Sequence, residues 1–312
     1  MTKVNTVLGP VPVAALGRAL MHEHVFLANP GWDLDSRNAA RRESDLTQIS
    51  TELAALREYG VKTILDPSPA DIGRNLSFMV DVARRSGINI IATTGLYKED
   101  HWLPVYFRLL EIDEIADWMV SELTEGMGGT EIKAGAIKVA TSLGRIGEFE
   151  EKTLRAAARA HKKTGAPIVT HTEGGTMGKE QIDIFESEGA DLSRIVNGHC
   201  CGNSDLLNQF DILKRGAIVG VDRIGVASMM PDVVRRGIAM SIISAGYASQ
   251  LLLSQDIVGI YYGRSTVTPP RPPERTYTNL LTDFIPKLRE AGVAEMSIET
   301  VLADLPRKFF GD

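Results

Sequence analysis

Six histidines occur in the 312-residue chain, and four of them follow short apolar stretches typical of β-strands. These four are His22, His24, His171 and His199. The first two are separated by one residue, so on a strand both imidazoles point to the same face. A lone histidine on such a face is usually a core residue. Four imidazoles at equivalent strand ends instead indicate a site for divalent metal ions.

Two charged residues interrupt stretches that are otherwise apolar or small. Lys138 lies within Ala134–Ala140, and Asp256 ends the segment Leu251–Asp256, whose first residues are typical of a buried strand. A buried ammonium is costly, so this lysine must pair with a carboxylate, lose its proton or be chemically converted. The simplest alternative is an ion pair with Glu23 or Glu173. A buried aspartate likewise needs a cation or a proton to accept.

The elements that must position these residues alternate along the chain. Short runs rich in Val, Ile and Ala precede longer segments with helical periodicity, and Gly, Pro, Asp or Asn mark the joins. We expect eight strands, over Ala19–Phe26, Val61–Leu65, Asn89–Thr94, Ala134–Ala140, Pro167–Thr172, Ile195–Cys200, Ala217–Val221 and Leu251–Ser254. We expect helices over Asp45–Tyr59, Asn75–Ser86, Ile112–Thr124, Glu148–Thr164, Lys179–Glu188, Ser204–Lys214, Asp232–Ala245 and Thr278–Ala291.

This alternation predicts an α/β fold, a single (β/α)8 or TIM barrel domain over residues 1–312. A doubly wound sheet is less favoured because the sequence has no GxGxxG or GxxxxGK[ST] motif. Met1–Leu16 are expected to form a short hairpin or cap. Gly259–Arg275, containing Pro269-Pro270-Arg271-Pro272-Pro273, is expected to be a long loop after strand eight with polyproline II character. Barrel active sites lie at the carboxyl ends of the strands, where the histidines are expected.

Composition and charge exclude several classes of protein. Lysine plus arginine number 34 and aspartate plus glutamate 40, so the net charge of −6 offers no basic surface for nucleic acid or an anionic membrane. No apolar stretch approaches the roughly 20 residues that span a bilayer. The first residues lack the apolar core of a secretory signal. Cys200 and Cys201 are adjacent and unsuited to a disulfide, so we expect a reducing, cytoplasmic compartment.

The order of these residues resembles the amidohydrolase superfamily, specifically its phosphotriesterase-like family. The resemblance extends over nearly the whole chain. Its order and spacing make it far more specific than the paired histidines alone. It is carried by Leu20–His24, Ile137–Val139, Val169–His171, Gly198-His199, Leu253–Asp256 and the terminal Pro306–Phe310.

What the resemblance implies is a binuclear metal centre in a metal-dependent hydrolase. By residue-for-residue carry-over, His22, His24 and Asp256 would hold the more buried metal. His171 and His199 would hold the more exposed one. Zinc is the expected ion, and cobalt, manganese or iron are alternatives because such ligands accept all of them.

The same resemblance implies a chemical role for the buried lysine. Lys138 would be carboxylated on its side-chain nitrogen by carbon dioxide, and the resulting carbamate would bridge both metals together with a hydroxide. That hydroxide would attack the carbonyl or phosphoryl group of the substrate. Asp256 would carry a proton to or from the attacking oxygen.

Within this family the chain is more similar to the lactonases than to the specialised phosphotriesterases. Tyr97, after strand three, matches a tyrosine that lies beside the metals in the lactonases, and Arg223, after strand seven, matches an arginine of their pocket. The resemblance therefore implies that acyl lactones are opened, with promiscuous hydrolysis of phosphotriesters. It also implies a homodimer that acts on a small-molecule substrate.

Three features depart from the lactonase pattern. Gln255 stands where relatives often carry His or Asn, Cys200-Cys201 follow a predicted ligand, and Leu305-Pro306 replaces the usual Asn-Pro. These differences leave another carboxylic ester, an amide or a phosphorylated sugar lactone open as the substrate. A catalytically silent barrel that binds a ligand is a remote alternative, because all six ligand positions carry suitable side chains.

Overall fold

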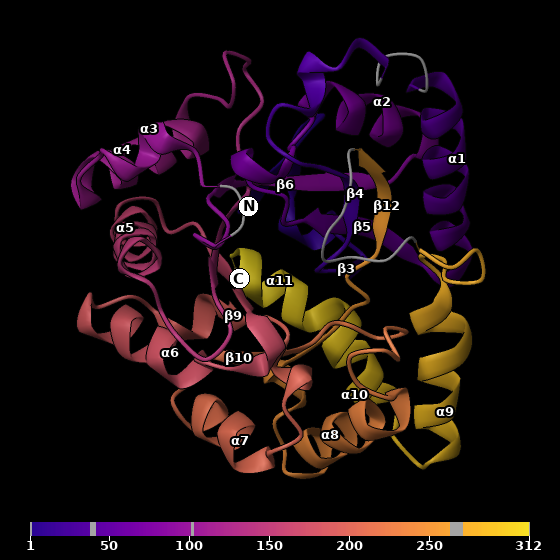
Figure 1. Cartoon of the computed structure of the whole chain (residues 1–312). Helices are drawn as coiled ribbons and strands as arrows, with labels where there is room; N and C mark the ends of the chain where they lie inside the picture. Colours follow the sequence, from indigo (N-terminus) through magenta and orange to yellow (C-terminus); the bar gives the residue numbers. More distant parts are fainter. Residues whose placement is uncertain (1, 38–41, 101–102, 263–270, 312) are drawn as a thin grey trace.

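The centre of the structure is a sheet of eight parallel strands surrounded by helices (Figure 1). The structure is a computed structural model, and it describes residues 2–37, 42–100, 103–262 and 271–311. Each strand pairs with the preceding strand of the sheet, as in the predicted (β/α)8 barrel. The strands are β3 (Arg18–Leu20), β5 (Val61–Asp66), β6 (Asn89–Gly95), β7 (Ala136–Thr141), β8 (Ile168–Thr172), β9 (Ile195–Asn197), β10 (Ile218–Val221) and β11 (Leu251–Leu253).

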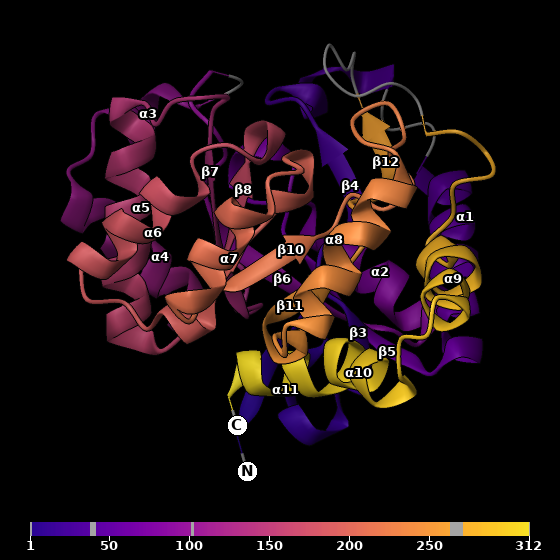
Figure 2. The same ribbon diagram turned by 90° about the horizontal axis from the view of Figure 1, so that it is seen from below.

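Two further strands close the barrel at its carboxyl end. β4 (His24–Ala28) continues strand one after a break at residues 21–23, and β12 (Val258–Tyr262) continues strand eight after a break at residues 254–257. The two strands pair in parallel, with His24 opposite Val258, and Figure 2 shows them side by side. The single strand predicted over Ala19–Phe26 is therefore two short strands.

The predicted long loop after strand eight begins as a strand. Residues up to Tyr262 belong to β12, because their backbone groups pair with the edge that β4 presents. Pro269 and Pro270 lie outside the described residues, so the polyproline II prediction is not tested there. The described part of the loop resumes at Arg271.

Helices cover the outside of the barrel, and the predicted helices over 112–124 and 148–164 have the observed bounds. α10 and α11 were not predicted; they are short, and a π-helical turn at Thr300–Asp304 separates them. The helices are α1 (Arg42–Ala55), α2 (Leu76–Ser86), α3 (Val105–Arg108), α4 (Ile112–Thr124), α5 (Glu148–Thr164), α6 (Gly178–Ser187), α7 (Leu206–Lys214), α8 (Asp232–Ser244), α9 (Ile285–Glu290), α10 (Glu295–Glu299) and α11 (Leu305–Phe310).

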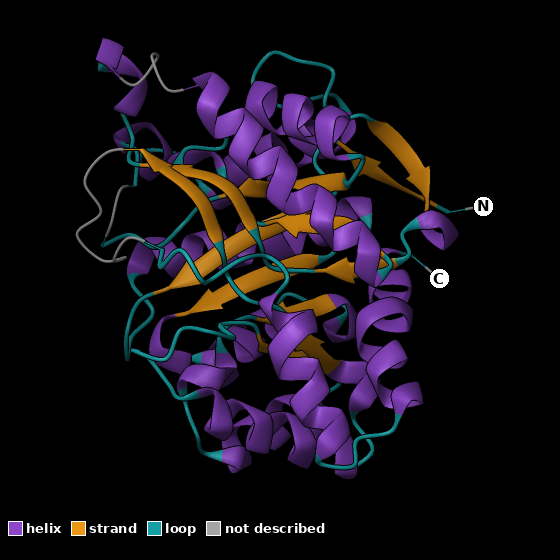
Figure 3. Ribbon diagram, turned by 90° about the vertical axis from the view of Figure 1, so that its right-hand side faces the viewer, coloured by secondary structure: helices purple, strands orange, loops and turns teal. Residues whose placement is uncertain are grey.

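An apolar cluster fills the amino-terminal end of the barrel. The predicted hairpin of β1 (Lys3–Thr6) and β2 (Gly9–Pro12) lies at this end, near both termini (Figure 3). The inward-facing residues of the cluster include Ala19, Met21, Leu65, Ile91, Ala136, Val169, Val196, Ile218 and Leu252, together with Leu305 and Phe309 of α11.

The period of the strands places polar groups directly above this cluster. Lys138 lies two residues after Ala136, and His171 lies two residues after Val169, so each shares the inward face of its strand. The barrel interior thus changes from apolar to polar toward the carboxyl ends. Among the described residues, no helix has both the length and the apolarity needed to cross a membrane.

Candidate metal centre

A cavity of about 1090 Å³ lies at the carboxyl ends of the strands. It brings together every site residue predicted from the sequence. These are His22, His24, Tyr97, Lys138, His171, His199, Arg223 and Asp256.

One buried carboxylate orients two of the imidazoles. Asp222 Oδ2 lies 2.8 Å from His22 Nδ1, and Oδ1 lies 2.9 Å from His199 Nδ1 and accepts from the His199 amide at 2.8 Å. Burial opposes ionisation of Asp222, but both imidazoles hold the pKa of its carboxyl well below the usual value. Because an ionised carboxylate only accepts, both Nδ1 atoms carry the proton. Each Nε2 lone pair is therefore free for a metal ion.

Two glycines make room for this carboxylate. A Cβ on Gly220 would lie 2.8 Å from Asp222 Oδ2, and a Cβ on Gly198 would lie 2.2 Å from the carbonyl oxygen of Thr170. Side chains at either position would displace the carboxylate or the neighbouring strand. The small residues that end these strands therefore allow Asp222 to reach both histidines.

A hydroxyl orients the third imidazole. Ser68 Oγ donates its proton to Asp66 Oδ1, since that carboxylate only accepts. Ser68 Oγ must then accept from His24 Nδ1, which lies 2.7 Å away. Burial lowers the pKa of His24, but hydrogen bonds to Asp256 and Asp66 outweigh it and raise that pKa to about 9. The other ring nitrogen, Nε2, faces the cavity side of the site and Asp256.

His171 has the opposite orientation. Its Nε2 lies 3.0 Å from Glu173 Oε2, which also accepts from Lys98 Nζ at 2.6 Å. The hydrogen bond from His171 holds the pKa of the Glu173 carboxyl far below its usual value, although burial opposes this, and Lys98 adds to it. His171 Nε2 therefore carries the proton, and Nδ1 is the nitrogen free for a metal.

Ring nitrogens of three histidines converge on Asp256. Its Oδ1 lies 3.2 Å from His24 Nε2 and 3.8 Å from His22 Nε2, and its Oδ2 lies 3.8 Å from His199 Nε2. Ligand atoms of His22, His199 and Asp256 lie within 4.8 Å of one another, a spacing that could hold a metal ion. The His171 ring lies beside that of His199, with centroids 4.6 Å apart. Imidazoles and a carboxylate facing one space fit a divalent transition metal.

Lys138 is buried and contacts this group of residues. Its Nζ lies 3.3 Å from His22 Nε2 and 3.3 Å from the carbonyl oxygen of Thr170. The ion pair considered from the sequence is wrong, since among the described residues Lys138 pairs with neither Glu23 nor Glu173, whose oxygens accept from other donors. Burial lowers the pKa of Lys138 to about 8. A neutral amine is therefore accessible close to neutral pH.

The two predicted pocket residues contact the ligand set directly. Arg223 Nε donates to Asp256 Oδ2 at 3.0 Å, so the arginine orients the aspartate. Tyr97 lies edge-on to His171, with ring centroids 5.0 Å apart and its hydroxyl 3.4 Å from Nδ1. Gly95 permits this turn, because a Cβ there would lie 1.9 Å from the carbonyl oxygen of Lys138.

The departures from the lactonase pattern lie outside the cavity lining. The side chain of Gln255 is buried and binds the carbonyl oxygen of Tyr277 and the amide of Leu280, at 2.7 and 2.9 Å. Cys200 and Cys201 are buried, and burial raises the pKa of both thiols, so both stay protonated and unreactive. Leu305 belongs to the apolar cluster at the opposite end of the barrel. The effect of these positions on the substrate is therefore indirect.

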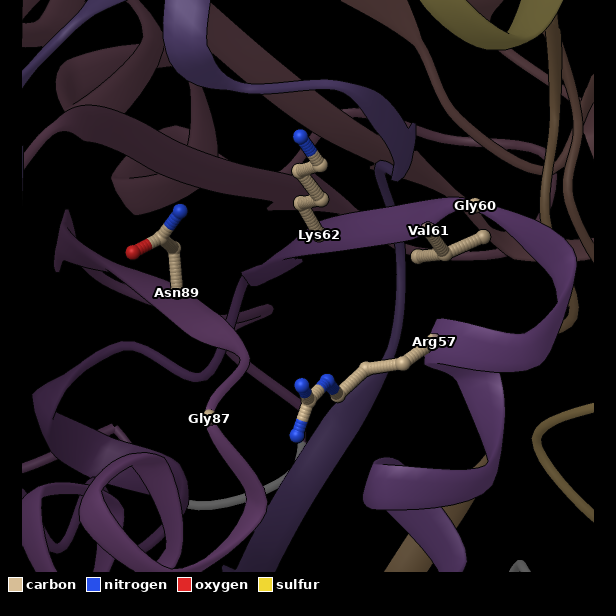
Figure 4. Close-up of a pocket in the computed structure, with 6 residues that line it drawn as sticks. All are labelled: Arg57, Gly60, Val61, Lys62, Gly87 and Asn89. Carbon is tan, nitrogen blue, oxygen red and sulfur yellow. The ribbon is translucent and has the colours of Figure 1, made fainter.

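A second, smaller cavity of about 410 Å³ lies where β5 and β6 begin. It is lined by Arg57, Gly60, Val61, Lys62, Gly87 and Asn89, and the Arg57 guanidinium points toward Gly87 (Figure 4). This lining includes no histidine or carboxylate. It also lies at the end of the barrel that contributes to stability rather than to catalysis.

Sequence reasoning missed the residues that orient the histidines. Asp222, Ser68 and Glu173 each follow the end of a strand, within two residues of it. A second signal was the Gly198 and Gly220 pair around Asp222. The contact between Asp222 and His22 joins residues 200 positions apart, which no local pattern reveals.

Comparison with known proteins identifies the family. A sequence profile of the Phosphotriesterase family matches residues 2–310, so the chain belongs to this family. A phosphotriesterase homology protein of Escherichia coli strain K12 is 36% identical over 94% of this chain and 98% of its own. An aryldialkylphosphatase of Saccharolobus solfataricus is 34% identical over 95% of each chain. A solved mutant of a Deinococcus radiodurans PTE-like lactonase is 34% identical, with a TM-score of 0.90 over 99% of this chain and 100% of that chain. The family thus contains hydrolases of phosphoesters and lactones.

Proposed function

We propose that residues 1–312 form one metal-dependent hydrolase domain that opens acyl lactones and hydrolyses phosphotriesters more slowly. The observation that carries this proposal is the convergence of imidazole nitrogens, one carboxylate and one buried lysine in a single cavity. Two relatives named for phosphoester and lactone chemistry support the same reading. The proposed ligands are His22, His24, Lys138, His171, His199 and Asp256.

The ligand set supports two divalent ions, most simply zinc, with cobalt, manganese or iron as alternatives. We propose that His22, His24 and Asp256 hold one ion and that His171 and His199 hold the other. When bound, the two ions supply hydroxide at neutral pH and polarise the bond under attack.

Lys138 is proposed to bridge the two sites as a carbamate. Its lowered pKa makes the neutral amine accessible, and an amine that adds carbon dioxide with loss of a proton becomes an anion. That conversion replaces a buried cation that has no carboxylate partner among the described residues. An anionic bridge also fits the cationic environment that two metals create.

Three further roles are proposed for side chains of the cavity. Asp256 carries a proton to or from the attacking oxygen, and Arg223 orients its carboxylate through Oδ2 at 3.0 Å. Tyr97 forms the wall beside His171. Arg223 and Tyr97 thus act at the edge of the ligand set.

The rest of the cavity favours an apolar acyl chain over a phosphorylated sugar. Its lining includes Leu27, Ile72, Val226, Met229, Val258 and Ile260. Its arginines are already engaged: Arg223 binds Asp256, Arg271 binds Glu52, and Arg275 binds backbone carbonyls. The phosphate group of a sugar substrate would therefore have to compete with these partners for a guanidinium group.

We expect lactones with longer acyl chains to be better substrates of the enzyme loaded with two equivalents of metal. Each methylene buried against the apolar wall contributes about 0.8 kcal/mol, so kcat/KM should rise about fourfold per methylene until the wall is covered. A series of acyl lactones, compared by kcat/KM with a simple ester, an amide, a phosphorylated sugar lactone and a phosphotriester, measures this.

The same series separates the alternatives. A highest kcat/KM for the phosphorylated sugar lactone, or no dependence on chain length, contradicts the acyl-lactone proposal but keeps a hydrolase. No hydrolysis of any compound, together with fewer than one bound metal per chain, would instead support a silent ligand-binding barrel.

We further propose that the chain forms a homodimer through α3 and Leu109, the residue that follows it. Val105, Tyr106 and Leu109 are 71, 67 and 76% exposed, a grouping of large apolar side chains that favours an interface. Figure 2 shows α3 at the rim of the molecule. Sedimentation should give a dimer mass for the native chain and a monomer mass for Leu109→Asp. A monomeric native chain contradicts the proposal.

We also propose a cytoplasmic location, which cell fractionation tests.

A further inference from the structure

The backbone of Asp256 has an unusual conformation. Its φ angle is 51°, in the left-handed region, and among the described non-glycine residues only Met177 and His199 also have positive φ. Side chains of L-residues disfavour this region, so such a conformation persists only where surrounding contacts determine it. The contacts around Asp256 therefore indicate how its carboxylate is aimed.

The side chain of Glu23 contacts the residues on both sides of Asp256. Its Oε1 accepts from the Gln255 amide at 2.9 Å and from Ser254 Oγ at 2.8 Å, and its Oε2 accepts from the Ile257 amide at 3.0 Å. Glu23 is fully buried. Its two oxygens thus bind the break in strand eight and hold the amides that flank Asp256.

Backbone hydrogen bonds join the same break to strand one. The Asp256 amide donates to the carbonyl oxygen of His22 at 3.0 Å, and the His24 amide donates to that of Ile257 at 2.7 Å. Glu23 lies between these two histidines in the sequence. The breaks in the first and last strands are therefore one hydrogen-bonded unit that carries two predicted ligands, His22 and Asp256, and joins a third, His24, at the start of β4.

Arg275 contacts the carbonyl groups of the same turn. Its Nη2 donates to the carbonyl oxygen of Gln255 and lies 3.4 Å from that of Asp256. The guanidinium also packs against Gly225, where a Cβ would lie 3.3 Å from Nε. The amides around Asp256 are thus bound by a carboxylate, and a carbonyl beside it by a guanidinium.

We propose that Glu23 and Arg275 are positioning residues that hold Asp256 in its left-handed conformation and so aim its carboxylate at His22 and His24. Glutamate suits this role because both of its oxygens accept, whereas glutamine would turn an NH₂ donor toward a backbone or hydroxyl donor. The inference rests on the proposed function, in which Asp256 is a metal ligand.

The first experiment compares Glu23→Gln with the native chain in the absence of metal. Hydrogen exchange should be about tenfold faster in the variant at the amide of Gln255 or of Ile257, whichever faces the new NH₂ group, because one of the two acceptor oxygens is lost. The second experiment titrates both proteins with cobalt(II) by equilibrium dialysis. The affinity for one of the two ions should fall roughly 10- to 100-fold, as is typical when an orienting partner is lost. The kcat should fall while KM stays constant.

Further variants distinguish positioning from general destabilisation. Arg275→Met should lower the affinity for the same ion. Arg275→Lys should restore part of that affinity, because an ammonium can still donate to the Gln255 carbonyl. Glu290→Gln, at an exposed glutamate on α9, is the matched control and should change neither measurement.

Unchanged exchange in Glu23→Gln overturns the inference, as does faster exchange with native cobalt affinity for both ions. If Glu23→Gln does not fold, the Arg275 pair decides by the same readouts. If the native chain binds no cobalt, the proposed function fails, and the exchange rates alone decide whether Glu23 holds the turn.

Discussion

Replacing Lys138 with methionine should abolish metal binding at native affinity and lower kcat/KM by more than about 100-fold, beyond the roughly 10- to 100-fold loss typical of an outer partner. The reason is that Lys138 lies among the imidazoles and is the proposed bridge between the two ions. Metal analysis of the purified variant and a lactone assay measure both effects.

The same substitution should stabilise the metal-free protein. Burial lowers the pKa of Lys138 from 10.5 to about 8. Below pH 8 the folded, metal-free chain therefore contains a buried ammonium that destabilises it. A shift of this size corresponds to about 3 kcal/mol, which methionine would remove at pH 7. The difference should shrink as pH rises from 8 toward 10.5, because the native lysine then loses its proton on folding. Denaturant unfolding in carbon dioxide-free buffer measures it.

Lys308→Met is the control, since Lys308 is exposed on α11. It should alter neither metal content nor activity. A Lys138→Met variant that binds two metals with native affinity would falsify the proposed bridge, and one that is less stable than the native chain contradicts the account of its burial.

Replacing Asp222 with alanine should weaken the binding of both metal ions, by roughly 10- to 100-fold each. Among the described residues, Asp222 alone accepts from both His22 Nδ1 and His199 Nδ1, and these histidines are proposed to bind different ions. Alanine fits between Gly198 and Gly220 and removes both carboxylate oxygens, so neither ring N–H keeps this acceptor. Equilibrium dialysis resolves the two affinities.

Ser68→Ala provides the comparison, because in the described part of the chain Ser68 contacts one predicted ligand, His24. This variant should lower the affinity for one ion and leave the affinity for the other unchanged. If Asp222→Ala also weakens the binding of a single ion, the assignment of His22 and His199 to different ions is wrong. If it weakens neither, Asp222 does not orient the ligands.

Much of the fold follows from local pattern. Apolar runs of strand length, and helical periodicity in segments such as Glu148–Thr164, predicted the barrel and most of its helices. β12 was not predicted, because its residues form a strand only where β4 offers an edge. α10 and α11 were missed since they are short and derive their order from tertiary packing, of Ile298 into the main apolar core and of Leu305 and Phe309 into the cluster at the amino-terminal end of the barrel.

The sequence by itself determined which chemical groups are present and where along the strands they occur. Strand periodicity alone places Lys138 and His171 on an inward face, and their order carries the family resemblance. Only the tertiary structure decided which ring nitrogen is free, through Asp222, Ser68 and Glu173. It also decided how Asp256 is aimed, since Glu23 and Asp256 lie in breaks of strands that meet only when the barrel closes. Hydrogen bonds between residues some 230 positions apart leave no local trace in the chain.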